Sequence, residues 1–352
     1  MTEILYTSPK IFKNSFTDKH LKDNRLFQGI PSIEVTRGGR LFAAWQIGGN
    51  CEPCNDNCVL LATSDDNGKT WLDPYMVIDH DEPESKLCNP ILWLDPLDRL
   101  WFFWMQNNQG YFGNSGVWAI RCDAPDAPAE SLAWTEPHRY SDHIIVTKPT
   151  VTKGGAWLYT AQDIADRHVT YTYSSTDGGE SFDELGAATS DFITWSESMI
   201  IERGDGLHQY ARVDNNQSRS VERSVSHDGG VTWSKFSFDG IEYPFVGAAS
   251  RFFLRRMKSG NLLYVHNDHE SQRTNMTAKL SLDDGKTWHS LLLDDRMWLS
   301  YPDGAQDENG VIRVIYDRGR STDKEIIMAT FTEDDILNGK PAKIELVSKS
   351  EA

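Results

Sequence analysis

Residues that could act on an acidic molecule occur in three segments of the C-terminal half of the chain. The first segment carries Glu197 and Arg212, the second Arg273, and the third Tyr301. A planar guanidinium binds a carboxylate through two hydrogen bonds and stays charged at any ordinary pH, so two convergent arginines suit an acidic ligand. A tyrosine is a weak nucleophile at its free pKa of about 10, but a carboxylate that takes its proton makes it competent. Together these residue types indicate nucleophilic attack on an acidic molecule.

Further polar residues in these segments are candidates for the same site. Asp303 follows Tyr301 by two residues and would face the same side of a strand, so it is a rival base or nucleophile. His266 and His269 precede Arg273 and are candidates for substrate contacts or acid/base catalysis. Histidines more often occupy surface or hydrogen-bonded core positions, and both residues also fit that interpretation.

Trp195 lies two residues before Glu197 and is a candidate for stacking on a sugar ring. Glu197 and Arg212 also fit an ordinary ion pair between strands, and Tyr301 also fits a packed core residue. The catalytic interpretation is favoured because these residues occur together with Arg273 in corresponding parts of the chain.

An internal repeat identifies the scaffold that must position these residues. The pattern Ser-x-Asp-x-Gly-x-Thr-Trp starts at Ser64, Ser226 and Ser281, and a softened copy starts at Ser175. Each copy follows a short run of β-branched or aromatic residues, so it lies in a hairpin. The Asp is expected to accept backbone N–H groups of the turn, the Gly to supply a positive φ, and the Trp to pack under the sheet. We therefore interpret these Asp boxes as structural.

The spacing of the copies predicts the fold. In chain order they are 111, 51 and 55 residues apart, and the first gap holds a decayed copy over residues 121–135. A repeat of about 50 residues with strands and no helical period is typical of a propeller blade. Residues 298–345 supply a sixth repeat, and residues 4–6 are expected to form a strand that closes the ring against it.

The sequence therefore predicts an all-β, six-bladed β-propeller with four-stranded antiparallel blades. A single domain is expected over residues 1–352. Its blades are expected at residues 25–78, 85–137, 143–186, 190–237, 243–292 and 298–345.

The chain resembles the sialidase (neuraminidase) family. The resemblance covers nearly the whole chain and is carried by the Asp boxes and by Trp195-x-Glu197, an Asp-Gly turn, Arg212, Arg273 and Tyr301. It implies three arginines that clamp the sugar carboxylate, a Tyr nucleophile activated by a Glu, and a carboxylic acid as acid/base catalyst. By position, Glu197 resembles the activating Glu and Tyr301 the nucleophile. Arg212 and Arg273 resemble two of the three arginines.

One position departs from the family pattern. Sialidases normally begin the first blade with Arg-Ile-Pro, whereas this chain has Gly29-Ile30-Pro31, so the first arginine is missing. Each charge-assisted hydrogen bond contributes about 1.5–3 kcal/mol, so this loss weakens the binding of ordinary sialic acid. A related ulosonic acid or a uronic acid fits equally well. Candidate replacements for the missing arginine are Arg25, Arg251, Arg255 and Arg256.

The acid/base carboxylate is expected in the loop over residues 48–56, where the candidates are Glu52 and Asp56. Cysteines in and near this loop give a weak zinc or redox signal, because C-x2-C-x3-C with one distant ligand is less specific than paired CxxC knuckles. Reduced free thiols are the favoured interpretation, and neither a metal nor a cofactor is predicted. These cysteines are Cys51, Cys54, Cys58 and Cys88.

Composition excludes several classes of partner. The net charge of −17, from 52 acidic and 35 basic side chains, repels nucleic-acid phosphates and anionic lipid headgroups. The N-terminus has no basic stretch followed by an apolar one, and no apolar run approaches about 18 residues. We therefore expect a cytoplasmic protein that binds neither nucleic acid nor membrane and whose partner is a glycan or acidic-sugar small molecule.

The leading hypothesis is a retaining exo-glycosidase of sialidase type that releases a terminal acidic sugar from a glycan. One alternative is a carbohydrate-binding propeller without catalysis, consistent with the missing arginine. The other is a lyase or a glycosidase acting on uronic acids, with His266, His269 or Asp303 as the base.

Overall fold

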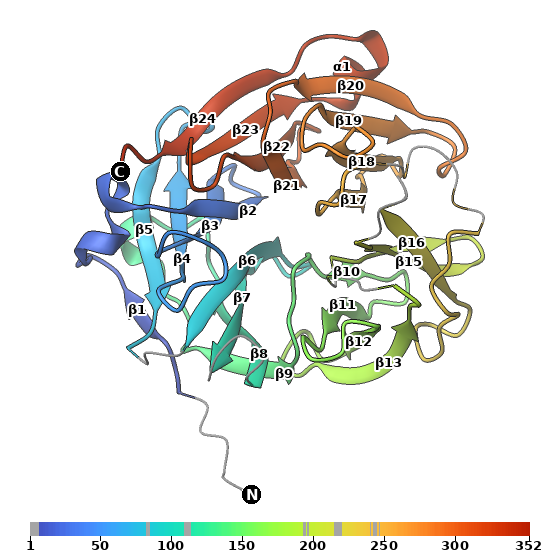
Figure 1. Ribbon diagram of the computed structural model, residues 1–352, viewed down its shortest axis with the longest axis horizontal. Helices are drawn as coiled ribbons and strands as arrows, with labels where there is room; N and C mark the ends of the chain where they lie inside the picture. The colour runs from blue at the N-terminus through green and yellow to red at the C-terminus, as the bar shows by residue number, and fades with distance from the viewer. Residues whose placement is uncertain are drawn as a thin grey trace, which may run out of the picture.

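The computed structural model describes residues 7–81, 85–108, 114–192, 195, 197–214, 220–239, 241, 245 and 247–352. Its strands form six antiparallel sheets arranged as blades around a central axis (Figure 1). The first and last blades lie side by side and complete the ring. The predicted all-β, six-bladed propeller is therefore confirmed.

The strands follow one another blade by blade along the chain. The first blade contains β1 (Lys10–Phe12), β2 (Gln28–Val35), β3 (Leu41–Ile47), β4 (Cys58–Ser64) and β5 (Leu72–Asp79). The second and third contain β6 (Lys86–Leu94), β7 (Leu100–Asn108), β8 (Asn114–Cys122), β9 (His138–Asp142), β10 (Thr150–Val151), β11 (Trp157–Gln162), β12 (Val169–Ser175) and β13 (Asp183–Thr189). The fourth and fifth contain β14 (Met199–Arg203), β15 (Gly206–Arg212), β16 (Val221–Ser226), β17 (Phe253–Arg256), β18 (Leu262–Asn267), β19 (Met276–Ser281) and β20 (His289–Asp294). The sixth contains β21 (Leu299–Gln306), β22 (Ile312–Arg318), β23 (Glu325–Phe331) and β24 (Lys343–Lys349).

Helical structure is confined to short connections. The 3-10 helices are Asp18–His20, Lys22–Asn24 and Ala129–Ser131, and the α-helix is α1 (Glu333–Asn338). Within the described ranges, no helix has the length and apolar character needed to cross a bilayer.

Two blades differ from the predicted four strands. The first sheet has five strands because β1 pairs antiparallel with β5 and covers the edge that this outer strand would otherwise expose. The fourth sheet has three described strands, and its outer side is represented by a bridge between Arg223 and Ser237. The predicted closing strand at residues 4–6 lies outside the described residues.

The Asp boxes have the predicted geometry and follow β4, β12, β16 and β19. In the box after β16, Asp228 accepts hydrogen bonds from the backbone N–H of Thr232 (2.9 Å) and from its hydroxyl (2.6 Å). Gly230 has φ 101°, and the indole of Trp233 donates to its carbonyl oxygen at 2.9 Å. The boxes at Asp66 and Asp283 repeat these bonds, so the motif is a turn that fixes each outer strand.

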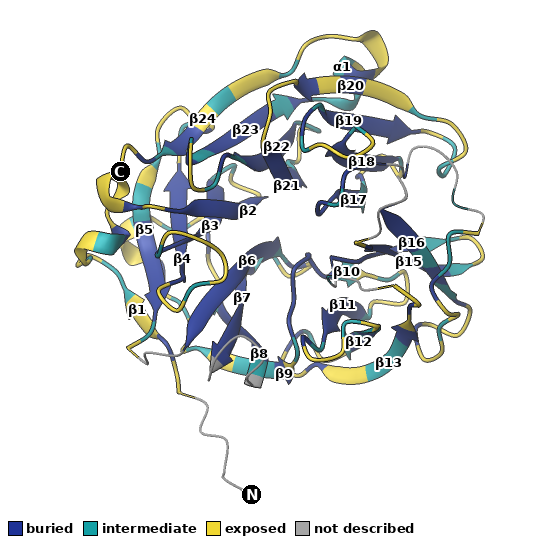
Figure 2. Cartoon of the chain, in the orientation of Figure 1, coloured by how far each residue is buried: buried dark blue, intermediate teal, exposed yellow. Residues whose placement is uncertain are grey.

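The core lies between neighbouring blades, around their inner and middle strands. β2, β3, β4 and β18 are buried along their whole length, whereas the outer strands β13, β20 and β24 each include several exposed residues (Figure 2). The inner and middle strands are therefore covered on both faces, whereas the outer strands are partly open to solvent. The blades therefore pack as rigid layers that hold their inner strand ends at the axis.

Two buried cations cross-link the inner strands. The guanidinium of Arg251 donates to the carbonyl oxygens of Pro31 (2.8 Å), Val146 (3.1 Å) and Tyr301 (3.1 Å). Lys148 forms ion pairs with Glu34 at 3.0 Å and with Asp303 at 3.3 Å. Because both side chains are nearly inaccessible, these bonds satisfy polar groups that water cannot reach.

Replacing Asp228 with Asn tests the structural role of the Asp box. Hydrogen bonds from the hydroxyl and backbone N–H of Thr232 lower the pKa of Asp228 to about 2, compared with about 4 for an unperturbed aspartate. The carboxylate therefore stabilises the folded state above about pH 4, and this contribution is lost as the pH falls towards 2. We expect Asp228→Asn to have the lower Tm at pH 7 and the difference to shrink on acidification, measured by circular dichroism.

The matched control is Asp239→Asn, which changes an exposed aspartate outside the motif. Its Tm should follow that of the parent protein across this range. A difference for Asp228→Asn that is the same at every pH would contradict the proposed role of the carboxylate.

Candidate functional site

A shared β-bulge in three inner strands brings side chains to the axis. In β2, β6 and β21, two residues face a single residue of the next strand, and the second of the two is a proline. Such a bulge bends the strand and re-aims a side chain. A positive φ in a bulky residue is strained and is concentrated at functional sites. The residues before the prolines have φ values of 57°, 52° and 55°, and they are Ile30, Asn89 and Tyr301.

Two of these residues line a pocket of about 300 Å³ near one end of the axis. The pocket is lined by charged side chains and by a second, mainly apolar set. The charged residues are Glu52, Glu197, Arg212, Asp214, Arg273 and Arg320. The other lining residues are Pro53, Cys88, Asn89, Met105, Ile144, Val146, Ile164, Trp195 and Tyr301. Glu197, Arg212, Arg273 and Tyr301, which the sequence suggested as one site, thus line the same pocket.

Arg212 joins the carboxylate of Glu197 to the phenol of Tyr301. Its Nη1 donates to Glu197 Oε1 at 3.0 Å, to Oε2 at 2.8 Å and to the hydroxyl of Tyr301 at 2.9 Å. Its Nη2 and Nε donate to Asp214 at 2.8 and 3.1 Å. Burial opposes the charge, but Glu197, Tyr301 and Asp214 together hold the pKa of Arg212 above its usual value.

Tyr301 is neutral in this arrangement. Burial raises its pKa, and the negative charge of Glu197 raises it further, whereas Arg212 and Arg320 oppose the shift. The guanidinium carbon of Arg320 lies 4.1 Å from the ring centroid, and those of Arg251 and Arg273 lie 5.1 and 5.4 Å away. Three cations around the ring would stabilise a phenolate once the proton has left.

Arg320 was not among the residues suggested from the sequence, and it occupies the space left at Gly29. A Cβ on Gly29 would lie 2.7 Å from Cγ of Arg320. Asp317 accepts from Nε of Arg320 at 3.0 Å and also from the backbone N–H of Ile30 at 2.8 Å, so it fixes the arginine to the first blade. Pairing of Ser300 with Asp317 places Arg320 just beyond the strand end beside Tyr301. This contact depends on the strand register, which a local sequence pattern does not reveal.

Donors remain open on two arginines. Nη2 of Arg320 is buried and has no hydrogen-bond partner among the described residues. Arg273 is half-buried; its Nη2 donates to the carbonyl oxygen of Ala249, and no carboxylate in the described part of the chain forms an ion pair with it. Burial lowers the pKa of Arg273, and the positive charges of Arg320 and Arg212 lower it further. An anion is therefore favoured between these two side chains.

Glu52 lies on the pocket rim and Asp56 does not line the pocket. Nη1 of Arg320 donates to Glu52 Oε2 at 2.8 Å, and the Glu52 side chain is 28 % exposed. Burial raises the pKa of Glu52, as do the charges of Asp317 and Glu197, while Arg320 opposes the shift. A carboxyl group with a raised pKa suits a general acid, so the geometry favours Glu52 over Asp56.

Four other candidates lie outside the pocket. Arg25 is buried and binds both oxygens of Asp73, at 2.7 and 3.1 Å. The ring of His266 stacks on Tyr264, and burial holds its pKa well below the usual value. His269 Nδ1 accepts two backbone N–H groups of its own loop.

Asp303 is the fourth of these residues. It accepts from Ser32 Oγ at 2.6 Å and from the backbone N–H of Ile33 at 3.0 Å. The bulge at Tyr301 breaks the period-two alternation that would have put both side chains on one face. Among the other suggested replacements, Arg251 binds backbone carbonyls, and Arg255 and Arg256 line other cavities.

The four cysteines of the predicted group do not form one cluster. Cys51 is exposed, Cys54 is half-buried, and Cys58 and Cys88 are buried, all as free thiols. The described residues contain one group of three potential ligands, formed by His20, Cys58 and Asp79.

Hydrogen bonding in that group does not favour a metal. The N–H of Thr17 donates to Nδ1 of His20, so Nε2 carries the proton and donates to Asp79 at 2.8 Å. Burial raises the pKa of Cys58 well above its usual value, which leaves a neutral thiol. The group is therefore a buried cluster in which the imidazole Nε2 and the thiol both keep their protons, and metal ligands must be deprotonated.

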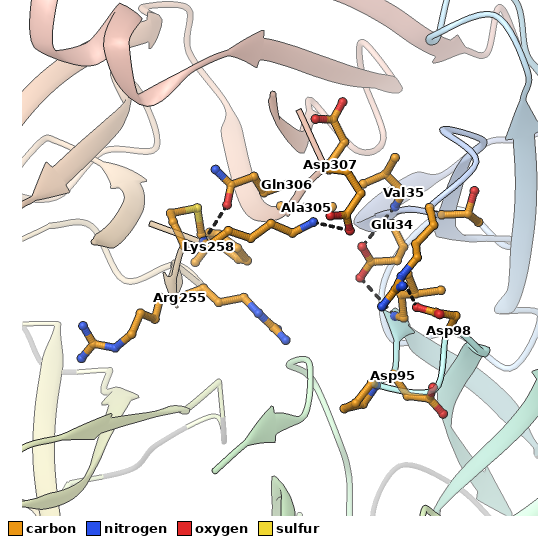
Figure 3. A pocket seen from close by; sticks show the side chains of 18 residues that line it. Glu34, Val35, Asp95, Asp98, Arg255, Lys258, Ala305, Gln306 and Asp307 are labelled. Carbon is orange, nitrogen blue, oxygen red and sulfur yellow. Dashed lines mark hydrogen bonds and ion pairs between the residues drawn. The ribbon is translucent and has the colours of Figure 1, made fainter. Parts of the chain in front are cut away.

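A second cavity of about 250 Å³ lies near the other ends of the inner strands (Figure 3). Its carboxylates are paired within the protein: Asp98 with Arg37 at 2.6 Å and Asp95 with Arg99 at 2.7 Å. Asp307 likewise binds Arg313 at 2.9 Å. No tyrosine lines it, so the pocket at Tyr301 is the better candidate for chemistry.

The chain matches the model of the BNR repeat-like domain family over residues 39–314. No curated protein matches it in sequence. Its fold is similar to that of the Hadza microbial sialidase Hz136, with 18% identity, a TM-score of 0.67 and coverage of 83% of this chain and 63% of that chain. It is also similar to the leech intramolecular trans-sialidase complexed with 2,7-anhydro-Neu5Ac, with 14% identity, a TM-score of 0.70 and coverage of 96% and 72%.

A protein of unknown function from Dyadobacter fermentans has 15% identity and a TM-score of 0.65, with coverage of 95% of this chain and 97% of that chain. Identities this low establish a shared fold, and this chain spans less than two thirds of the length of Hz136. The family model, in contrast, covers more than half of the chain and includes the four Asp boxes. The chain therefore belongs to the BNR repeat-like domain family, and its six-bladed propeller has a fold similar to those of the two sialidases described above.

Proposed function

We propose that this protein is a retaining exo-glycosidase that releases a terminal acidic sugar from a glycan. The observation that carries the proposal is the convergence of Glu197, Arg212, Arg273, Arg320 and Tyr301 in one pocket. A cavity of about 300 Å³ suits one terminal sugar, whose ring would pack on the apolar lining residues.

The substrate carboxylate would bind to the open donors of Arg273 and Arg320. Arg320 projects over Gly29, so the sixth blade would supply the arginine that is missing from the first. Arg212 is already engaged by Glu197 and Asp214, and its role would be to hold the carboxylate and the phenol together. Three arginines would thus surround the reacting sugar.

Tyr301 would attack the anomeric carbon after passing its proton to Glu197. Both groups bind the same Nη1 of Arg212, which places the carboxylate beside the phenol. Proton transfer removes the charge of Glu197 and creates a phenolate that Arg212 and Arg320 stabilise. Until the proton moves, the phenol is neutral, so it repels an anionic substrate less than a carboxylate nucleophile would.

Glu52 would protonate the leaving oxygen and later activate water. Its pKa is raised, which favours the protonated carboxyl that a general acid requires. Elimination by a lyase mechanism is less favoured, because none of its suggested bases, His266, His269 and Asp303, lines the pocket.

Conservative changes at the reacting pair test the mechanism. Tyr301→Phe removes the nucleophilic oxygen and Glu197→Gln removes the proton acceptor, so each should lower kcat by at least about 100-fold. Turnover of an activated aryl glycoside of sialic acid, and of other acidic sugars if that fails, is the measurement. Tyr171→Phe and Glu202→Gln are matched controls outside the pocket and should retain activity. Unchanged turnover in both pocket variants would reject the mechanism.

Arg320→Lys tests the transferred arginine. It keeps the charge but removes the planar fork, so affinity for the free acidic sugar should fall about 10- to 100-fold, the equivalent of one charge-assisted hydrogen bond. Binding of the sugar and of its methyl ester is compared by calorimetry, since only the acid should lose affinity. Gly29→Ala should weaken binding in the same way because its Cβ displaces Arg320.

Arg256→Lys, which changes an arginine outside the pocket, serves as the control for Arg320→Lys. Equal losses for the acid and for its methyl ester would show that Arg320 does not bind the carboxylate.

The pH dependence tests Glu52. If the protonated carboxyl is the acid, the rate falls as the pH rises through its raised pKa, and Glu52→Gln removes this alkaline limb of the kcat/KM profile. The loss should be large for a glycan and small for a glycosyl fluoride, whose leaving group needs no proton. Asp56→Asn should leave the pH profile of kcat/KM unchanged for both the glycan and the glycosyl fluoride. An alkaline limb that persists in Glu52→Gln would show that another residue is the acid.

A further inference from the structure

A third pocket, which is more open than the other two, adjoins the candidate active site. Its volume is about 370 Å³, and it shares Arg273 and Arg320 with the first pocket. Its remaining lining residues are Trp298, Ser300, Gly319, Ser321 and Thr322. One groove therefore runs from Tyr301 past the two arginines to Trp298.

Trp298 is unusual in both exposure and conformation. Its side chain is 64 % exposed, and its φ is 68°, a region that bulky residues rarely occupy. Within the described residues, no aromatic ring stacks on the indole and no cation lies over it. A strained backbone that presents a large apolar ring to solvent is expected where the ring has a binding role.

The conformation of Trp298 is fixed by the turn that carries Arg320. The backbone N–H of Gly319 donates to the carbonyl oxygen of Trp298 at 3.1 Å, and those of Thr322 and Lys324 donate to the carbonyl of Gly319 at 2.9 and 2.7 Å. The hydroxyl of Ser321 donates to the carbonyl oxygen of Asn50 at 3.2 Å, in the loop that carries Glu52. The indole, the arginine and the proposed acid thus belong to one connected rim.

We propose that Trp298 is the platform on which the leaving-group sugar of the glycan stacks. This inference rests on the proposed function and extends it to the second sugar of the substrate. With the acidic sugar held by Arg273 and Arg320, the glycosidic oxygen faces the rim at Glu52, and the next sugar enters the groove. The apolar face of a pyranose covers an indole well. The hydroxyls of Ser321 and Thr322 lie at the same groove for its polar edge.

The chemistry of the groove favours a neutral sugar over a second acidic one. Arg273 and Arg320 are its cations, and both are assigned to the first carboxylate. The other polar groups at the groove are hydroxyls, which suit uncharged hydroxyl groups. Trp298 therefore selects glycans in which the terminal acidic sugar is attached to a neutral pyranose.

The test compares two substrates of one acidic sugar, its glycosyl fluoride and its conjugate to lactose. Fluoride is too small to reach the indole, whereas the galactose of lactose would lie on it. Trp298→Ala should lower kcat/KM for the lactose conjugate about 10-fold, the scale of one aromatic contact, and leave the fluoride rate within about 2-fold. Trp298→Phe should restore most of the loss. Met297→Ala, at the exposed neighbouring residue, is the control.

Inhibition by free lactose provides an independent readout. Its inhibition constant against fluoride hydrolysis should rise about 10-fold in Trp298→Ala and stay unchanged in Met297→Ala. Equal losses on both substrates, or none on the lactose conjugate, would overturn the role of Trp298. Absence of fluoride hydrolysis by the parent protein would instead overturn the proposed glycosidase function, so the two failures are distinguishable.

Discussion

The site depends on buried cations that satisfy the backbone at the propeller axis. Bulged inner strands leave carbonyl groups without ladder partners, and an unpaired buried carbonyl is costly. Arg251 binds carbonyls of Pro31, Val146 and Tyr301 and so ties three blades together at the proposed nucleophile. Lys148 also cross-links the inner strands, through ion pairs with the carboxylates of Glu34 and Asp303. The strained conformation of Tyr301 persists because these contacts over-determine it.

This framework supports a pocket whose charges balance internally. Three arginines and three carboxylates line it, so the empty site needs no external counterion. The balance is uneven in space, because Arg212 is paired on two sides while Arg273 has no carboxylate partner among the described residues. An acidic ligand therefore meets a local positive field although the whole chain carries a net charge of −17. The net charge of the chain and the local field beside Arg273 therefore have opposite signs.

The sequence predicted the scaffold well because the Asp boxes are local turns whose bonds lie within eight residues. It also predicted the grouping of Glu197, Arg212, Arg273 and Tyr301, since their places in successive blades bring them to one end of the axis. Long-range contacts were harder to infer.

Arg25 was suggested as a replacement for the missing first arginine because it is close in sequence. In the structure it instead binds Asp73, 48 residues away in sequence. Asp303 shows a second limit, since it was placed on the face of Tyr301 by strand alternation, and a bulge at Pro302 removed that alternation. Local patterns predict turns and strands, whereas partners across blades depend on register and on bulges.

Arg320 occupies the space beside Gly29, the position at which the family resemblance led us to expect an arginine. The first and last blades are neighbours across the closure of the ring, so a guanidinium can reach the same space from either. Entry from the sixth blade requires that position 29 have no side chain, which glycine satisfies, and an anchor, which Asp317 provides. Because Asp317 also binds Ile30, the anchor couples the two bulges on either side of the closure. Gly29 and Arg320 are therefore structurally coupled: the glycine is needed because the arginine lies above it.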